Sequence, residues 1–315
     1  MLPLVKTKKI INLPPFIRIL SYLLMVFSLL FCFLVYILLM VNLGDTPTMS
    51  VPSENALPPV SSSPASPQPP QSGPGEIPPP VQEAYYGETV LPNSDLAAKI
   101  RTASKANTDT VGWLTVPGTA IDYPVMQYID NAYYLRRNYI DRRYKFAGSI
   151  FADYRDVGTN RNDLSRNYVI YGHNLTMSDD KLDGEMFAEL LRFRDYDFAR
   201  QSQYIYYSTL QDTMIWQVFA VFYTDTNYYY INVSPGSDAE FMDLVNEAKQ
   251  RSEFIYDADI TAGDKILTLS TCTYRYNTKA EQRFVVMARL VPDNTAEAKE
   301  VLINPRPKPP NFDEN

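Results

Sequence analysis

The chain has 315 residues, of which 45% are hydrophobic and 21% are charged, a composition that excludes a wholly disordered or collagen-like protein. It contains 2 Cys and 1 His, too few for a disulfide framework or for a zinc site built from Cys and His. The formal net charge of −7 makes duplex nucleic acid an unfavourable partner.

The first apolar segment, residues 19–43, predicts a single transmembrane anchor. Its uncharged part, 19–41, is long enough to cross the ~30 Å hydrocarbon core of a bilayer as a helix. Basic residues precede it and acidic residues follow it, so we expect residues 1–18 in the cytoplasm and the rest outside the cell, on the cell membrane. A cleaved signal peptide is the alternative, but its apolar region is shorter and Leu43-Gly44-Asp45 is a poor cleavage site.

Residues 44–84 predict an extended linker. This Pro/Ser-rich stretch holds half of the 24 prolines and cannot bury a core, so it favours polyproline II. Beyond residue 43 acidic residues outnumber basic ones, which argues against binding to an anionic surface by bulk charge. The simplest interpretation is a stalk that holds a domain away from the membrane.

Residues 85–291 predict one mainly β domain with a few helices. Alternating or apolar runs predict strands over 111–116, 120–126, 149–153, 167–171, 204–207, 214–223, 265–272 and 284–290. Capped or periodic segments predict helices from Asn93 or Ser94 to Ala106, over 186–198 and over 237–251. Many short strands with few helices indicate a β-barrel decorated by helices. The polar, Pro-rich residues 292–315 are expected to form a disordered tail.

Two potentially reactive side chains follow apolar strand-like runs. His173 ends the sequence Tyr-Gly-His, and Cys272 ends the sequence Leu-Ser-Thr-Cys. If both project from strand ends into one cleft, they are suited to nucleophilic catalysis, because a neighbouring imidazolium stabilises the reactive thiolate. The alternatives are a small buried cysteine and a loop histidine bonded to the backbone. Cys32, within the apolar segment, is expected to be structural.

An arginine is the expected third member of such a site. Its permanently charged guanidinium offers several donors to the oxyanion of a tetrahedral intermediate. Arg275 and Arg283 both follow Cys272 in the chain. We favour Arg283, because it opens the final strand, and an antiparallel neighbour would bring its start to the end of the Cys272 strand.

These blocks together resemble a sortase. The run ending at Cys272, the Tyr-Gly-His ending at His173 and the arginine that opens the last strand carry the resemblance. The upstream blocks at 111–114 (Val-Gly-Trp-Leu), 130–135 (Asp-Asn-Ala-Tyr-Tyr-Leu) and 148–155 (Gly-Ser-Ile-Phe-Ala-Asp-Tyr-Arg) are similar to class B sortases. The resemblance covers about 85–291.

The resemblance implies a closed eight-stranded β-barrel of the sortase type and a cysteine transpeptidase without cofactor or metal. Carried over to matching positions, Cys272 is the nucleophile, His173 the general acid and base, and Arg283 the oxyanion and substrate clamp. The residues that would line the groove for the substrate peptide are Asn131, Leu135, Tyr230, Ile231 and Ser270.

The sequence departs from the family pattern directly after the cysteine. Some class B members carry acidic residues there, proposed to orient the histidine, whereas here Thr273 and Tyr274 follow Cys272. A Cys-His-Arg site is therefore a simpler expectation than a Cys-His-Asp triad.

The implied partners are exported proteins with a C-terminal sorting signal, of Asn-Pro-x-Thr-x type or similar, and an acceptor amine. We expect cleavage after Thr through a thioester on Cys272, followed by transfer to a cell-wall precursor amine. A pilus-polymerising sortase that uses a pilin Lys is one alternative, and a non-catalytic anchored binding domain is another. A papain-like protease usually has Cys before His, and an L,D-transpeptidase has a second His near the Cys, so both fit less well.

Overall fold

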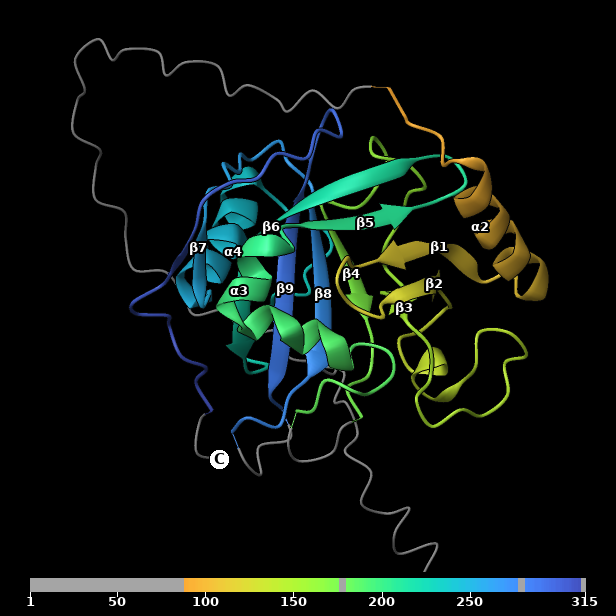
Figure 1. Cartoon of the computed structure of the whole chain (residues 1–315), viewed down its shortest axis with the longest axis horizontal. Helices are drawn as coiled ribbons and strands as arrows, with labels where there is room; N and C mark the ends of the chain where they lie inside the picture. Colours follow the sequence, from red (N-terminus) through yellow and green to blue (C-terminus); the bar gives the residue numbers. More distant parts are fainter. Residues whose placement is uncertain (1–87, 176–179, 277–280, 313–315) are drawn as a thin grey trace, which may run out of the picture. The chain divides into compact units, whose positions relative to one another are not determined.

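The computed structural model describes residues 88–175, 180–276 and 281–312 (Figure 1). The expected cytoplasmic N-terminus, anchor and linker at 1–18, 19–43 and 44–84 lie outside these residues. Across the part of the chain that is described, no helix combines the length and the apolar character that crossing a membrane requires.

The strands are β1 (Thr110–Thr115), β2 (Asp122–Met126), β3 (Phe151–Ala152), β4 (Asn167–Tyr171), β5 (Tyr204–Ser208), β6 (Thr213–Thr224), β7 (Phe254–Tyr256), β8 (Ile266–Cys272), β9 (Arg283–Leu290) and β10 (Val301–Ile303). The α-helices are α2 (Ser94–Ala106), α3 (Tyr196–Gln201) and α4 (Asp238–Arg251), and the 3₁₀ helices are η1 (Tyr133–Arg136) and η2 (Ala188–Arg194).

Eight strands close into a barrel in the order β1-β2-β3-β4-β8-β9-β6-β5, with β5 paired to β1. This confirms the closed eight-stranded barrel expected from the sequence. Six of its eight pairings are antiparallel, while β2 with β3 and β4 with β8 are parallel. Because parallel strands point the same way, β4 and β8 bring their carboxyl ends to the same edge of the barrel.

The barrel is closed around a core of aromatic and branched side chains. Trp216 on β6 is completely buried, and the hydroxyl groups of the buried Tyr168 and Tyr207 lie 2.9 Å apart. Pairing these two hydroxyl groups matters because an unpaired buried hydroxyl would destabilise the fold. Strand β4 is buried at every position, as its run Tyr-Val-Ile-Tyr predicts, and its first residue, Asn167, is a buried polar side chain.

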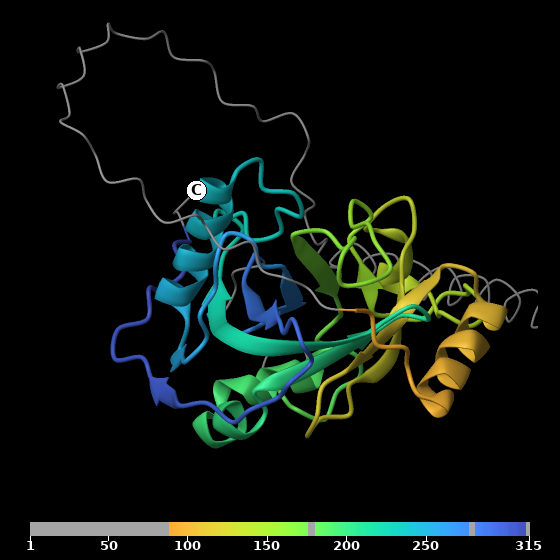
Figure 2. The ribbon, with the colours of Figure 1, turned by 90° about the horizontal axis from the view of Figure 1, so that it is seen from above.

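Helices α2 and α4 lie on opposite sides of the barrel (Figures 1 and 2). The side chain of Asn93 caps α2 by accepting a hydrogen bond from the Leu96 N–H, which decides between the two expected caps. Ser237 caps α4 by accepting from the Glu240 N–H. The Glu240 carboxylate does not complete the capping box at Ser237 but accepts from the Gly236 N–H instead.

The expected single helix over 186–198 is two shorter helices, η2 and α3. Asp195 stands between them with extended backbone angles, and its carboxylate accepts a hydrogen bond from the Phe198 N–H. An aspartate in this conformation starts a new helix rather than continuing the old one, which explains the break.

The prediction of a disordered tail is wrong for residues 292–312, which include a strand and pack against the domain. In this segment β10 pairs with β7, which the sequence analysis also missed, and Lys308 forms an ion pair with Glu247 at 2.6 Å. The chain then returns to the barrel, where the Asn311 N–H donates to Asp225 and the Phe312 ring contacts the Tyr276 ring. The strand consists of only three residues, and its pairing depends on a partner distant in sequence, so local polarity concealed it.

A buried ion pair joins the loop before β4 to the turn between β5 and β6. Arg161 donates from Nε and Nη2 to the two carboxylate oxygens of Asp212, at 2.9 and 2.8 Å. The two side chains are 1% and 0% exposed, so each charge depends on the other for its solvation. Asp212 also accepts from the Arg161 and Val90 N–H groups.

We expect Arg161→Met to lower the free energy of unfolding by about 3–5 kcal/mol, because it leaves the Asp212 carboxylate buried without its counter-charge. Urea denaturation followed by circular dichroism measures this change. The matched control is Arg200→Met, which breaks an exposed pair with Asp197 and should cost less than about 1 kcal/mol. Equal losses in the two variants would contradict the assignment.

Candidate active site

The pairing of three strands brings Cys272, His173 and Arg283 to one edge of the barrel. Cys272 and Arg283 are direct partners across the antiparallel pair β8 and β9. The parallel pair β4 and β8 ends at Tyr171 opposite Ser270, and His173 and Cys272 each stand two residues further along. The three strands run side by side in Figure 1. This register places the expected nucleophile between the expected base and the expected clamp.

Cys272 is a free, partly exposed thiol at the last position of β8. Its neighbours along the strand, Thr271 and Ser270, are buried, so the backbone that carries the thiol is fixed by the barrel. A thiol held by a rigid strand but open to solvent can meet a substrate, unlike a cysteine packed in a core.

His173 is held by the backbone of η1. Its Nε2 lies 2.7 Å from the Leu135 carbonyl oxygen. A carbonyl only accepts, so Nε2 carries the hydrogen here, and Nδ1 is the bare nitrogen of the neutral ring. Nδ1 is therefore the atom that can take up a proton while this contact lasts.

The pKa of His173 is lowered to about 4. Burial is the main cause, the positive charge of Arg136 adds to it, and the hydrogen bond with the Leu135 carbonyl opposes it. At neutral pH the ring is therefore a neutral base. The sequence analysis considered a resting pair of imidazolium and thiolate. A pKa this low disfavours the imidazolium and so favours a neutral ring at rest.

Arg283 is buried at the first position of β9, and its Nη1 donates to the Gln282 carbonyl at 3.0 Å. Burial raises the pKa of Tyr230, while the nearby charge of Arg283 lowers it. The Arg283 guanidinium is therefore close enough to Tyr230 to influence its hydroxyl group electrostatically. The other candidate, Arg275, lies with its guanidinium over the ring of Tyr223 at 4.7 Å.

The loop 225–236, between β6 and α4, brings Tyr230 against β8, while Ile231 packs against the cluster that contains Phe151 and Tyr171. The hydroxyl group of Tyr230 lies 2.9 Å from that of Ser270, so two of the residues expected to bind substrate are in contact. Tyr230 is buried and Ile231 is partly buried.

Asn131 and Leu135 occupy different environments from each other. The Asn131 side chain is buried, donating to Asp153 at 2.9 Å and accepting from the Tyr154 N–H at 2.9 Å. Its amide is therefore engaged with the loop after β3. Leu135 is partly buried and presents its carbonyl oxygen to His173. The substrate-binding roles of both residues stay predictions.

Asp180 is a residue of this edge that sequence reasoning missed. Its buried carboxylate accepts from the Asn174 amide at 3.0 Å, from the Thr273 hydroxyl at 2.5 Å and from the Tyr274 N–H at 3.0 Å. It thereby ties the segment after His173 to the segment after Cys272. The family pattern has its acid directly after the cysteine, whereas Asp180 is 93 residues from Thr273 in the chain, and no local pattern marks it.

Among the described residues, no group of His, Cys, Asp and Glu side chains is arranged to hold a metal ion. The chemistry of this edge consists of a thiol, a neutral imidazole and a guanidinium. This set can carry out acyl transfer through a covalent intermediate: a nucleophile, a base and a donor for the oxyanion.

Comparison with known proteins agrees with this geometry. Residues 114–291 match the sortase domain family. The chain is 38% identical over 200 residues to sortase B of Listeria monocytogenes, covering 63% of this chain and 76% of the relative. It is 32% identical over 187 residues to sortase B of Staphylococcus aureus, covering 59% and 72%. A solved Staphylococcus aureus sortase B–substrate complex superposes with a TM-score of 0.55 at 30% identity, covering 62% of this chain and 86% of that one.

The chain belongs to the sortase family, and within it to class B. It is a sortase-type cysteine transpeptidase. Family membership thus sets aside the non-catalytic binding domain that the sequence alone left open.

The lowered pKa of His173 can be tested directly, because the chain contains 1 His. A protein without a histidine tag therefore gives a single imidazole signal. We expect NMR titration to give a pKa near 4, with the ring neutral at pH 6. The unfolded chain takes up the proton near pH 6.5, so the free energy of unfolding falls as the pH drops from about 6.5 to 4.

The variant Arg136→Gln should raise the pKa of His173, because it removes a neighbouring positive charge. The signal should vanish in His173→Gln. A titration midpoint at or above 6.5 in the wild-type protein would contradict the assigned environment.

Proposed function

We propose that this protein is a membrane-anchored class B sortase that cleaves a C-terminal sorting signal after Thr and transfers the protein to a cell-wall precursor amine. The observation that supports the proposal is that Cys272 lies directly opposite Arg283, on the strand that pairs in parallel with the one His173 follows. The named class B relatives, one of them solved as a complex with a substrate, support a transpeptidase of this class.

In the first half-reaction, the sulfur of Cys272 attacks the Thr carbonyl carbon of the sorting signal, and the thiol proton passes to the neutral imidazole of His173. The oxyanion that forms accepts hydrogen bonds from Arg283. The carbon–nitrogen bond then breaks, and His173 returns the proton to the leaving amine. The product is a thioester on Cys272.

In the second half-reaction, an amine attacks the thioester carbonyl and gives its proton to His173. The carbon–sulfur bond breaks, and the Cys272 sulfur recovers the proton. An amide bond has been exchanged for another amide bond, so no external energy source is needed. We propose a cell-wall precursor as the amine donor, as the resemblance to class B sortases implies.

The proposed location follows from the sequence alone. An uncleaved helix over 19–43 and an extended linker over 44–84 would hold the catalytic domain at the outer face of the cell membrane. Sorting signals arrive at that face with their exported proteins, so anchor and substrate would meet there.

The thioester predicts a mass adduct. We expect intact mass spectrometry of the full-length protein in detergent, incubated with peptides of Asn-Pro-x-Thr-x and related types, to show a peptide adduct ending at Thr. The adduct should be absent in Cys272→Ala and released by an added amine. Wild-type protein that forms no adduct with any peptide, and whose thiol alkylates slowly, would contradict the proposal.

The oxyanion role predicts a difference between the two arginines. Arg283→Lys should lower kcat for peptide transfer by about 10²–10³-fold, because it removes the oriented guanidinium donors. Arg275→Lys is the matched control on the neighbouring loop and should stay within a few-fold of wild type. A comparable loss in both variants would exclude a specific role for Arg283.

A further inference from the structure

The loop 225–236 is held to the barrel through three consecutive carbonyl groups. The Asn167 amide donates to the Tyr230 and Asn232 carbonyls, at 2.9 and 3.0 Å. The carbonyl between them, that of Ile231, accepts from Nη2 of Arg155 at 3.2 Å. Asn167 and Arg155 thus hold the backbone of the loop, and the Tyr230 hydroxyl group contacts Ser270, two residues before the end of β8.

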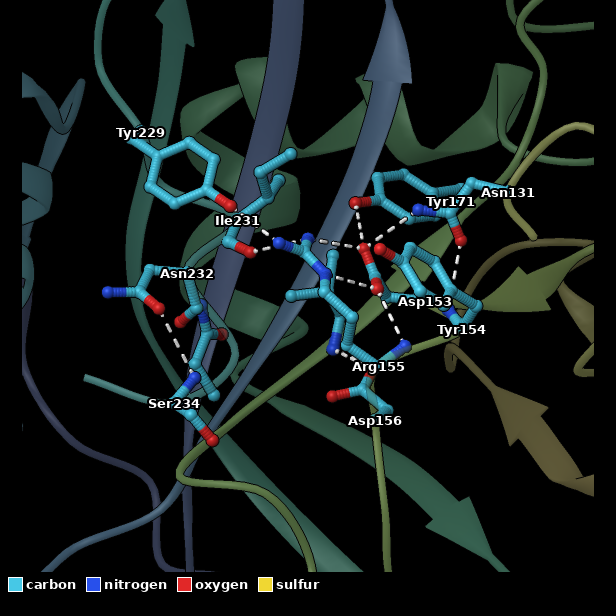
Figure 3. A network of polar contacts seen from close by, with 12 residues as sticks. Asn131, Asp153, Tyr154, Arg155, Asp156, Tyr171, Tyr229, Ile231, Asn232 and Ser234 are labelled. Atoms are coloured by element: carbon cyan, nitrogen blue, oxygen red, sulfur yellow. Dashed lines mark hydrogen bonds and ion pairs between the residues drawn. The ribbon is translucent and has the colours of Figure 1, made fainter. Parts of the chain in front are cut away.

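Arg155 is itself fixed by a buried carboxylate. Its Nε and Nη2 donate to the two oxygens of Asp153, each at 2.8 Å, and its own N–H donates at 2.9 Å (Figure 3). The Asp153 side chain is 0% exposed and also accepts from the Tyr171 hydroxyl and the Asn131 amide. Burial raises the pKa of this carboxyl, but the hydrogen bonds, first those from Arg155, bring it below its usual value.

The remaining donors of the guanidinium face the loop. Nη1 donates to the Tyr229 hydroxyl at 2.5 Å, and Nη2 reaches the Ile231 carbonyl as well as Asp153. Figure 3 shows the guanidinium between Asp153 on one side and Tyr229 and Ile231 on the other. One side chain therefore connects the loop after β3 to both neighbours of Tyr230.

We propose that Arg155 is a positioning residue for peptide binding: by joining Asp153 to Tyr229 and Ile231, it fixes the loop 225–236 over the end of β8. This inference rests on the proposed function and adds to it the element that sets affinity for the sorting signal. Arg155 acts on the peptide through the loop, while the reactivity of Cys272 depends on β8 and does not involve it.

The geometry requires an arginine. A guanidinium is planar and offers five hydrogen-bond donors in a fixed geometry. It can therefore donate to a carboxylate from one edge and to the loop from another. A lysine keeps the positive charge next to Asp153 but has one nitrogen, and it cannot make these contacts together. Arg155→Lys thus separates the loss of the connection from the loss of charge.

The matched control is Arg161→Lys. Arg161 also binds an aspartate, Asp212, through Nε, Nη2 and its own N–H. In the described part of the chain, neither Arg161 nor Asp212 forms a hydrogen bond with the loop 225–236. It is the more deeply buried of the two arginines, 1% against 29% exposed. Arg161→Lys should therefore destabilise the fold at least as much as Arg155→Lys.

The experiment compares wild type, Arg155→Lys, Tyr229→Phe and Arg161→Lys as full-length proteins in detergent. Three quantities are measured: KM and kcat for a peptide that acylates the wild-type enzyme, the rate of Cys272 alkylation by iodoacetamide without peptide, and hydrogen exchange of the amides in 225–236. We expect Arg155→Lys to raise KM about tenfold or more, with kcat and alkylation within a few-fold of wild type. Tyr229→Phe should show a smaller rise in KM.

Hydrogen exchange in the loop should become faster in Arg155→Lys and remain unchanged in Arg161→Lys. An unchanged KM, or unchanged loop exchange, in Arg155→Lys would overturn the proposal. So would parallel losses in KM, kcat and alkylation, since these indicate general destabilisation. A wild-type protein that accepts no peptide would instead refute the proposed function, while the exchange data would still decide whether Arg155 fixes the loop.

Discussion

The parallel pairing of β4 with β8 is the constraint on which the candidate site depends. These strands are distant in sequence, yet parallel pairing sends both carboxyl ends to one edge of the barrel. Parallel pairing therefore brings the end of β4, two residues before His173, next to the end of β8, which carries Cys272. Strand β9, antiparallel to β8, adds Arg283 from its start. Cys272 and Arg283 are thus placed by the barrel itself, and His173 is held just beyond it by the Leu135 carbonyl of η1.

The electrostatics of His173 determine the order in which protons can move. A buried imidazole next to a positive charge is neutral at pH 7, and a neutral ring can accept a proton but does not act as an acid. In the mechanism that we propose, the proton that His173 delivers to the leaving amine would therefore come from the thiol in the same turnover. The proposed mechanism then starts from the thiol and a neutral imidazole, not from a preformed ion pair.

The sequence predicted those parts of the fold and of the candidate site that a local pattern of residues marks. Apolar runs located the eight barrel strands, and Cys272, His173 and Arg283 were identifiable because each borders such a run. The strands β7 and β10 were missed because each has three residues and is defined by its partner. Asp180 and Arg155 were not recognised as parts of the site for a similar reason: their contacts are formed across 93 and 76 residues of chain.

The return of the C-terminal segment to the barrel has a practical consequence. Asn311 and Phe312 lie against Asp225 at the start of the loop that follows β6 and against Tyr276 in the segment that follows Cys272. A fusion partner or affinity tag attached directly after Phe312 would begin next to both contacts. Engineering of this protein for peptide ligation is therefore better served by attachment at an exposed position on the far side of the barrel, such as the outer face of α2.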